Sequence, residues 1–177
     1  MPPQLLRSSR TSMDNYAIRF SGAVIISMVM AFAITMIPLP EVLEKWRPEW
    51  VALTLVHWAL MVPRKTGILL AWCSGLFLDA LYGSSLGQHA LGLTFVVFIS
   101  LRMRPRISLT TLSHQLTVLL FALGTYLLIN LWVLGFTGNS PSAWVYWLSL
   151  VGSLLVWPIY HWLLTLLFMM PTRFNDM

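Results

Sequence analysis

The chain alternates between long apolar runs and short polar segments. A helix needs about 20 predominantly apolar residues to cross the hydrocarbon core of a bilayer, so runs of this kind predict membrane-spanning helices. The predicted spans are residues 17–37, 50–62, 66–82, 86–101, 111–136 and 143–170. The sequence therefore predicts an all-α membrane protein, with an N-terminal tail at 1–16, a six-helix domain at 17–170 and a C-terminal tail at 171–177.

Two of the predicted spans have unusual lengths. The second, residues 50–62, is short for a bilayer about 30 Å thick, so it must tilt, cross a locally thinned membrane, or be sheltered by neighbouring helices. The sixth is long and contains Pro158, which predicts a kink because proline removes a backbone hydrogen bond. Turns are predicted at residues 83–85 and 135–141, where Gly, Ser and Pro gather.

The composition agrees with a membrane location. The chain is 58% hydrophobic and only 10% charged, whereas soluble domains carry about 25% charged residues. The single cysteine, Cys73, excludes an intrachain disulfide framework. The first apolar run lacks an evident cleavage site, so we expect it to remain as a span and not to be removed as a signal peptide.

The basic residues predict the topology of the spans. The net charge is +5, but the eleven basic residues lie at the edges of apolar runs, so they indicate orientation and not a nucleic-acid partner. With a cytoplasmic N-terminus, the outer side carries only Lys45 and Arg47, beside Glu41, Glu44, Glu49 and Asp79. The inner side then carries Arg7, Arg10, Arg19, Arg64, Lys65, Arg102, Arg104, Arg106 and Arg173. This bias predicts a membrane protein of six spans with both termini in the cytoplasm.

One acid, Asp79, ends an otherwise uncharged apolar run. A carboxylate costs roughly 2.5–3.5 kcal/mol at the bilayer centre on insertion scales, so Asp79 needs an interfacial position or a polar partner. Gly75, Asp79, Gly83 and Gly87 recur every fourth residue, and they would share one face if a helix continued that far.

Two interpretations of Asp79 stay open. In the first it lines an outward-facing cavity or pairs with a partner subunit. In the second it is a helix-end acid that hydrogen-bonds the Gly83-Ser84-Ser85 turn and the start of the fourth span, with His89 as a further partner. The two are compatible, because a turn held in this way could position the rim of a cavity.

No arrangement of residues points to catalysis. There is no His-Glu-x-x-His helix for zinc, no Gly-x-Ser-x-Gly nucleophile turn and no Gly-rich loop followed by Lys. The four histidines, His57, His89, His114 and His161, fall on four different predicted spans, which favours hydrogen-bonded or interfacial roles over a metal site. The sequence therefore predicts neither an enzyme nor a bound cofactor.

Two charged segments lie at predicted membrane edges. Trp46-Arg47-Pro48-Glu49-Trp50 is typical of an aromatic belt and a turn, although its arginine could also dock a partner's carboxylate or a lipid headgroup. The cluster Arg102-Met103-Arg104-Pro105-Arg106 is typical of a stop-transfer anchor on anionic lipid, with a cytoplasmic protein contact as the alternative.

Four segments in the same order resemble the MreD family of rod shape-determining membrane proteins. Arg47-Pro48-Glu49-Trp50 resembles the Arg-Pro segment of that family, and the stretch from Gly75 through Asp79 to Leu91 is similar to its most recognisable segment. Pro63-Arg64 and Leu155-Val156-Trp157-Pro158 also resemble enterobacterial members. The N-terminal tail is longer than is usual in the family.

The resemblance implies a fold, a role and partners. It implies a six-helix bundle similar to the S-components of energy-coupling-factor transporters, with Asp79 and its glycines near the outer mouth. It implies a non-catalytic subunit of the machinery that builds lateral peptidoglycan in rod-shaped bacteria. The implied partners are MreC, and within the same complex MreB, RodA and a penicillin-binding transpeptidase, together with membrane lipids.

We therefore predict a scaffold that binds MreC by helix packing and rim contacts. The alternative is a membrane protein that binds a small molecule or a lipid-linked precursor, as an S-component does. The polar residues within the spans that such a site could use are Asp79, His57, His89, Gln88, Asn130 and Gln115. The predicted binding residues are Asp79, Gly75, Gly83, Gly87, Arg47, Trp50 and His89.

Overall fold

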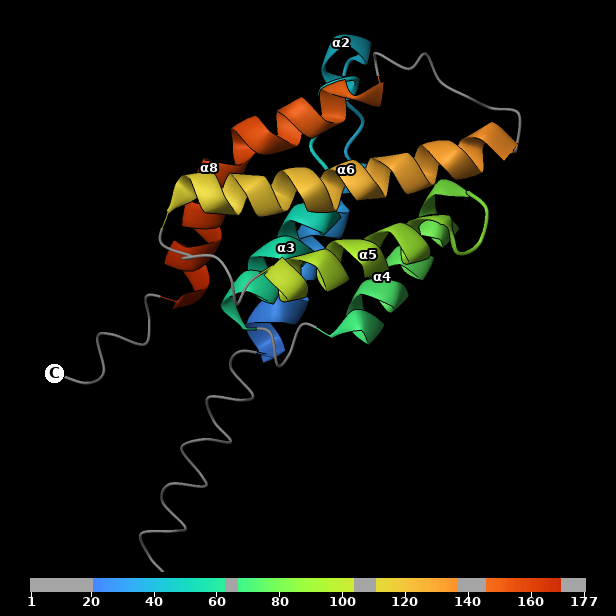
Figure 1. Ribbon diagram of the computed structural model, residues 1–177. Coiled ribbons are helices and arrows are strands. Elements are labelled where there is room, and N and C mark those ends of the chain that lie inside the picture. Colours follow the sequence, from blue (N-terminus) through green and yellow to red (C-terminus); the bar gives the residue numbers. More distant parts are fainter. Residues whose placement is uncertain (1–20, 63–66, 104–110, 137–145, 170–177) are drawn as a thin grey trace, which may run out of the picture.

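The computed structural model describes residues 21–62, 67–103, 111–136 and 146–169, and these residues form helices joined by short connections (Figure 1). The first helix is Ser21–Met36. A single turn, α2 (Glu41–Glu44), precedes α3 (Trp50–Met61), α4 (Ile68–Tyr82) and α5 (Gln88–Met103). The last two helices are α6 (Leu112–Phe136) and α8 (Leu148–Met169).

The predicted spans and the observed helices correspond one to one within the described residues. Helices α3 and α4 end within one residue of the predicted boundaries, at Met61 and Tyr82. Helix α5 begins two residues later than predicted, at Gln88, and ends two residues later, at Met103. The turn predicted at 135–141 begins too early, because α6 continues through Gly135 to Phe136; its remaining residues lie outside the described part of the chain.

Only two of the described helices pass a length and composition test for membrane spans. These are α6 and the part of α8 from Leu148 to Phe168, whereas four apolar helices of 10–17 residues are shorter. The shorter ones are Ser21–Met36, Trp50–Met61, Ile68–Tyr82 and Gln88–Met103. The structure is thus all-helical and its composition fits a membrane protein.

The short helix α3 is enclosed by its neighbours. All ten residues from Val51 to Leu60 are buried, so α3 has no lipid-facing side along most of its length. Twelve residues of helix rise only about 18 Å, which is well below the thickness of the hydrocarbon core. Of the three ways in which this short segment could be accommodated, the structure has the third, shelter by neighbouring helices.

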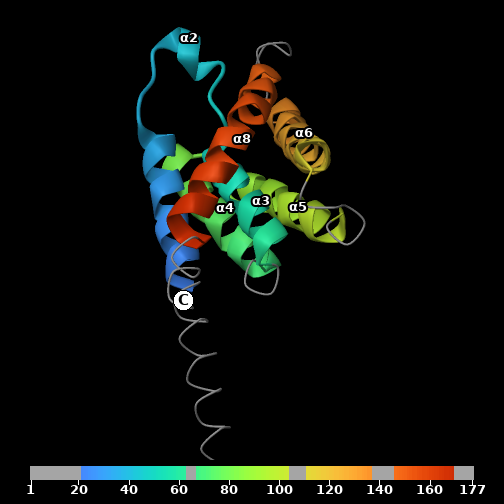
Figure 2. The same cartoon turned by 90° about the vertical axis from the view of Figure 1, so that its left-hand side faces the viewer.

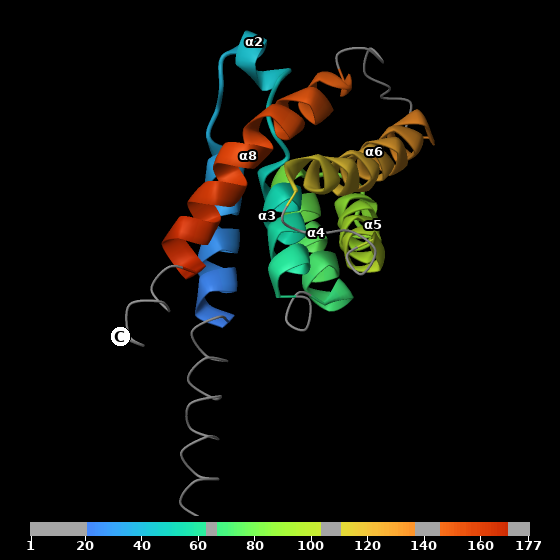
Figure 3. The same ribbon diagram turned by 60° about the vertical axis from the view of Figure 1, so that its left-hand side comes forward.

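The other helices surround α3 with apolar side chains on both their inner and outer faces. Figures 2 and 3 place the first helix beside the second half of α8, and the first helix also contacts α4, where the rings of Phe32 and Phe77 have centroids 4.9 Å apart. Large apolar side chains such as Ile25, Leu69, Trp132 and Leu155 point outward and are more than half exposed. Exposed side chains of this kind on several helices are expected where lipid takes the place of water.

Two glycines bring backbones into close contact. A Cβ atom on Gly75 of α4 would lie 2.1 Å from the Cα atom of Ala90 on α5. A Cβ atom on Gly152 of α8 would lie 2.2 Å from the carbonyl oxygen of Trp46. Small residues allow such close approach between membrane helices, where apolar burial alone gives little drive for association.

The predicted bend in α8 is visible. Pro158 lies inside the helix, and in Figure 1 the axis of α8 changes direction between its first part, near α2, and its second part. The missing N–H of proline accounts for the bend.

Candidate functional site

Asp79 is the centre of a hydrogen-bond network at one end of the bundle. Its Oδ1 accepts bonds from the Ser84 hydroxyl at 2.9 Å and from the backbone N–H of His89 at 2.9 Å. Its Oδ2 accepts the backbone N–H of Gly87 at 2.8 Å. The His89 ring also lies against it, with Nδ1 2.8 Å from Oδ1. The expectation that Asp79 binds the turn and the start of the next helix is confirmed.

The local chain direction explains this network. Helix α4 ends at Tyr82 and is capped by Gly83, which adopts a left-handed conformation with φ of 63°. The N–H groups of Gly83 and Ser84 both donate to the Asp79 carbonyl. Gly87 follows with φ of 99°, which favours glycine. The turn thereby directs the first N–H groups of α5 at the Asp79 carboxylate, and a negative charge is favoured at a helix N-terminus.

The four-residue spacing of Gly75, Asp79, Gly83 and Gly87 does not form a single helical face. The helix stops at Tyr82, so Gly83 and Gly87 belong to the turn, and the reason for each is its positive φ. Gly75 shares a helix with Asp79, but it packs against the backbone of α5 inside the bundle. Its predicted role in binding a partner stays a prediction.

Arg47 fastens the segment before α3 to the first helix. Its guanidinium donates to the carbonyl oxygen of Ile37 at 2.5 Å and of Ile34 at 3.4 Å, at the C-terminal end of Ser21–Met36. It also pairs with Glu44 of α2 at 2.7 Å. A cation is favoured at a helix C-terminus, where carbonyl groups lack intrahelical partners.

A cavity of about 310 Å³ lies between this segment and the Asp79 turn. Arg47 and His89 both line it, so two of the predicted binding residues meet here. Trp50 instead packs against the ring of Tyr160, with 5.5 Å between ring centroids, and it does not line the cavity. The lining is otherwise contributed by Thr35, Glu44, Pro48, Glu49, Tyr82, Gln88, Tyr126, Asn130, Leu134, Tyr146 and Ser149.

Glu49 is the principal lining residue that the sequence did not suggest. It is half-buried, its Oε1 accepts a bond from the Ser149 hydroxyl at 3.1 Å, and its backbone N–H donates to Ser153 at 3.0 Å. Loss of contact with water raises the pKa of the Glu49 carboxyl above its usual value, although nearby His89 and the Ser149 bond oppose the rise. The available signal in the sequence was its position between Pro48 and the start of an apolar run at Trp50.

A second polar cluster joins α3 to α8 deeper in the bundle. The Nδ1 atoms of His57 and His161 lie 3.0 Å apart, and the Thr54 and Tyr160 hydroxyls lie 2.6 Å apart. The two histidines lie on different predicted spans, and no local pattern indicates that they pair. No group of three or more His, Cys, Asp or Glu residues that could hold a metal occurs among the described residues.

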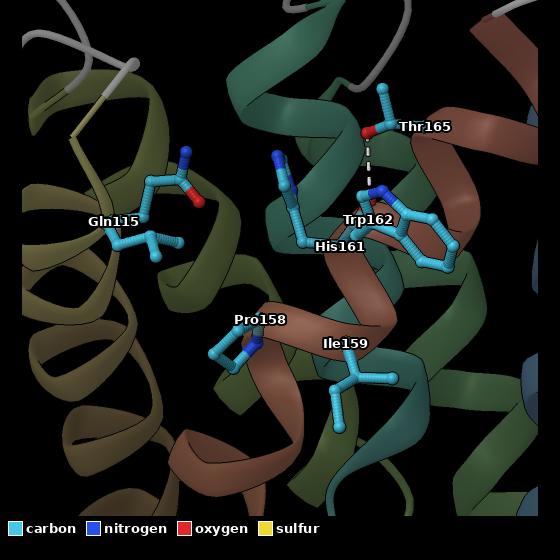
Figure 4. Close-up of a pocket in the computed structure, with 7 residues that line it drawn as sticks. Gln115, Pro158, Ile159, His161, Trp162 and Thr165 are labelled. Atoms are coloured by element: carbon cyan, nitrogen blue, oxygen red, sulfur yellow. Dashed lines mark hydrogen bonds between the residues drawn. The ribbon is translucent and has the colours of Figure 1, made fainter.

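His161 also borders a largely apolar groove between α6 and α8. Figure 4 shows Gln115 of α6 across from Pro158, Ile159 and His161 of α8. The polar groups here are already bonded within the chain: Gln115 accepts a bond from the Trp157 indole at 3.1 Å, and Thr165 donates to the His161 carbonyl at 2.8 Å. The groove therefore offers little polar recognition.

Comparison with known proteins assigns the chain to a family. A family model described as rod shape-determining protein MreD matches residues 17–169, which include every described helix. The chain belongs to the MreD family. The rod shape-determining protein MreD of Haemophilus influenzae is 30% identical over 133 residues, which cover 73% of this chain and 80% of that protein. No solved structure matches the chain.

Family membership confirms the resemblance drawn from the Arg47 and Asp79 segments. MreD proteins are membrane proteins that determine rod shape, so the cavity and the Asp79 turn belong to a shape-determining protein. The implied similarity to the S-component fold stays a prediction.

Proposed function

We propose that this protein is a non-catalytic inner-membrane scaffold of the bacterial cell-wall elongation complex, and that it binds MreC. Membership of the MreD family is the observation that carries the proposal. MreB, RodA and a penicillin-binding transpeptidase are the further partners that we expect in the same complex.

We further propose six spans, formed by the first helix and α3, α4, α5, α6 and α8, with both termini in the cytoplasm. The bias of basic residues supports this topology, because the segments that it assigns to the inner side hold nine of the eleven. The clustering of Glu44, Arg47 and Glu49 with the Asp79 turn around one cavity supports a common outer end.

The fixed geometry of this outer end suits a scaffold. Asp79 binds the turn and α5, while Arg47 binds the first helix and α2, so four elements are held in place by charged side chains. A partner that rests on this rim would meet a preorganised surface, which lowers the entropic cost of association.

The test is affinity purification of the full chain from membranes in mild detergent, followed by mass spectrometry of the retained proteins. We expect stoichiometric MreC with the wild-type chain and reduced MreC with Asp79→Leu, at unchanged membrane insertion. Ser113→Ala, on the exposed start of α6, is the matched control and should retain MreC. Unchanged MreC recovery with Asp79→Leu, together with normal cell shape, would contradict a role for this rim; absence of MreC from the wild-type sample would contradict the scaffold itself.

A further inference from the structure

The cavity beside Asp79 contains hydrogen-bonding groups that the chain does not satisfy. Among the buried side-chain atoms of the described residues, Asn130 Oδ1 and Arg47 Nε have no hydrogen-bond partner, and both residues line this cavity. Asn130 is only 2% exposed, and its amide N–H₂ donates to the Tyr126 carbonyl at 3.1 Å. This bond fixes the orientation of the side chain, and its amide oxygen remains without a donor. Buried polar groups without a hydrogen-bond partner destabilise a protein, so they call for a ligand or another explanation.

The unmet groups are of opposite kinds. Asn130 Oδ1 needs a donor, and Arg47 Nε needs an acceptor. A hydroxyl group can serve as either, so a ligand that carries several hydroxyls could satisfy both. An ammonium group could satisfy only the first, and a carboxylate or phosphate only the second.

The charges of the cavity are already compensated within the chain. Arg47 pairs with Glu44 at 2.7 Å, and Asp79 is bonded by His89 and two backbone N–H groups. Glu49 is hydrogen-bonded by Ser149. Each charged lining residue thus already has a bonding partner within the chain, which is a charged group for Arg47 and a neutral hydroxyl for Glu49.

Aromatic rings complete the lining. Tyr82, Tyr126 and Tyr146 border the cavity together with the His89 ring, which is tilted by only 32° from the Tyr82 ring at 5.5 Å. Rings of this kind present flat apolar faces beside polar edges, which suits a ligand with C–H faces and hydroxyl edges. At about 310 Å³ the cavity is at the lower end of small-molecule sites, which limits the ligand to a single small ring.

From the unpartnered Asn130 and Arg47 atoms, the compensated charges and the tyrosine lining, we infer that this cavity binds one uncharged sugar ring. The ring could be a free monosaccharide or the headgroup of a glycolipid, which enters from the outer leaflet. The inference does not depend on MreC binding.

The experiment measures ligand binding to the full chain in nanodiscs of phosphatidylethanolamine and phosphatidylglycerol, so that no sugar detergent occupies the cavity. The free probes are glucose and N-acetylglucosamine, and the lipid probe is monoglucosyl diacylglycerol incorporated in the disc. Tryptophan fluorescence and native mass spectrometry report occupancy. Glutamate and choline are the charged comparisons. We expect saturable one-to-one binding of at least one uncharged probe and none of the charged ones.

Two variants locate the site. Asn130→Leu removes the unpartnered acceptor, and Arg47→Lys removes Nε while it keeps the positive charge near Glu44; each should weaken binding about tenfold, the effect of losing one hydrogen bond to a buried group. Gln115→Leu changes another buried polar residue of α6 at the far end of the helix, outside this cavity, and should leave affinity unchanged. Arg47→Lys serves alone if Asn130→Leu fails to fold.

The possible results distinguish a free sugar from a glycolipid headgroup, and they include results that would contradict the inference. Binding of the free sugars indicates a soluble ligand, and binding of the glycolipid alone indicates a headgroup. Failure of all uncharged probes to bind, stronger binding of a charged probe, or unchanged affinity in both cavity variants would overturn the inference. Each of these results leaves the recovery of MreC in the pull-down unaffected, so the scaffold proposal is judged separately.

Discussion

At the scale of single residues, the end of the bundle at the Asp79 turn depends on a carboxylate that accepts bonds from both backbone and side-chain groups. Asp79 is 1% exposed, and two of its bonds are to the N–H groups that begin α5. These N–H groups have no intrahelical carbonyl to bond, so the side chain replaces partners that the helix itself cannot supply. The acid thus stabilises the junction of two helices.

Asp79→Leu should therefore destabilise the protein more than Asp79→Asn. Leucine leaves the N–H groups of Gly87 and His89 and the Ser84 hydroxyl without an acceptor, whereas asparagine keeps one acceptor oxygen. We expect a loss of about 2 kcal/mol or more for leucine and a smaller loss for asparagine. Thermal unfolding followed by tryptophan fluorescence in detergent tests this order. Equal unfolding temperatures for Asp79→Leu and the wild type would contradict it.

Glu49 gives the protein a pH dependence of the opposite sign to that of most carboxylates. Burial raises its pKa above the usual 4.5, so the folded protein holds a proton that the unfolded chain releases. Its contribution to stability is complete below pH 4.5 and is lost as the pH rises through the folded-state pKa.

The stability of Glu49→Gln relative to the wild type should consequently increase as the pH rises. Glutamine cannot ionise, so the difference in unfolding temperature between variant and wild type should grow in favour of the variant above pH 4.5. Glu41→Gln, on the exposed turn α2, is the matched control and should show a constant difference. A Glu49→Gln difference that stays level between pH 4.5 and pH 8 would refute the assignment.

Sequence reasoning reached some of these residues and missed others for a physical reason. Asp79 stood out because a charge in an apolar run is costly, and its partners were near in the chain. The His57–His161 pair joins residues 104 apart, and Asn130 becomes significant only because it faces a cavity. Distant pairs and cavities are set by tertiary packing, which no local pattern encodes.

At the scale of helices, close contact between α4 and α5 is the main feature. Gly75 is necessary because the α5 backbone at Ala90 occupies the space that a side chain would need. Positive φ, and not helix packing, explains Gly83 and Gly87. The regular four-residue spacing of glycines therefore had two unrelated causes, which is why it misled as a pattern. The helix boundaries were predictable, because Pro, Gly and charged residues end the apolar runs.

Gly75→Ala should destabilise the bundle while Gly124→Ala should not. The new methyl group at Gly75 would lie 2.1 Å from a backbone atom, so α4 and α5 must move apart, at a cost of about 1–3 kcal/mol or more. A Cβ atom on Gly124 of α6 would have no atom of another element within 4 Å, so alanine should be neutral or stabilising by about 0.5–1 kcal/mol. Unfolding temperatures of the two variants provide the comparison. Equal effects would show that the α4–α5 contact is not tight.

At the scale of the whole molecule, the arrangement of the five other long apolar helices of the described residues around α3 determines which side chains lipid and water can reach. Helix α3 is too short to span a bilayer alone, so the proposed six-span topology requires that it cross the membrane within a bundle and not as an independent span. The sequence predicted the six long apolar helices of the described residues in their order, but not the single-turn helix α2. The enclosure of α3 could not be predicted, because its run is as apolar as those of the exposed helices.

The proposed topology can be tested by chemical labelling of Cys73 and of single cysteines introduced at other positions. Cys73 is exposed on α4 within a predicted span, so in the membrane it should face lipid and resist a water-soluble maleimide, which reacts with thiolate. In a Cys73→Ser background, Glu41→Cys should be labelled in intact spheroplasts and Thr111→Cys only after the membrane is opened. Both positions are exposed in the structure, so access depends on the side of the membrane.

The basic residues before α6 should hold this orientation. Of the three arginines, Arg102 ends α5 and Arg104 and Arg106 lie outside the described residues. Replacing all three with glutamine should let the reagent reach Thr111→Cys from outside in part of the molecules, because the positive charges that retain this loop in the cytoplasm are gone. MreC recovery should change less than the labelling. If Thr111→Cys is labelled in intact spheroplasts with the arginines present, the proposed topology is wrong. The opposite orientation would then hold, with the Asp79 cavity on the cytoplasmic side.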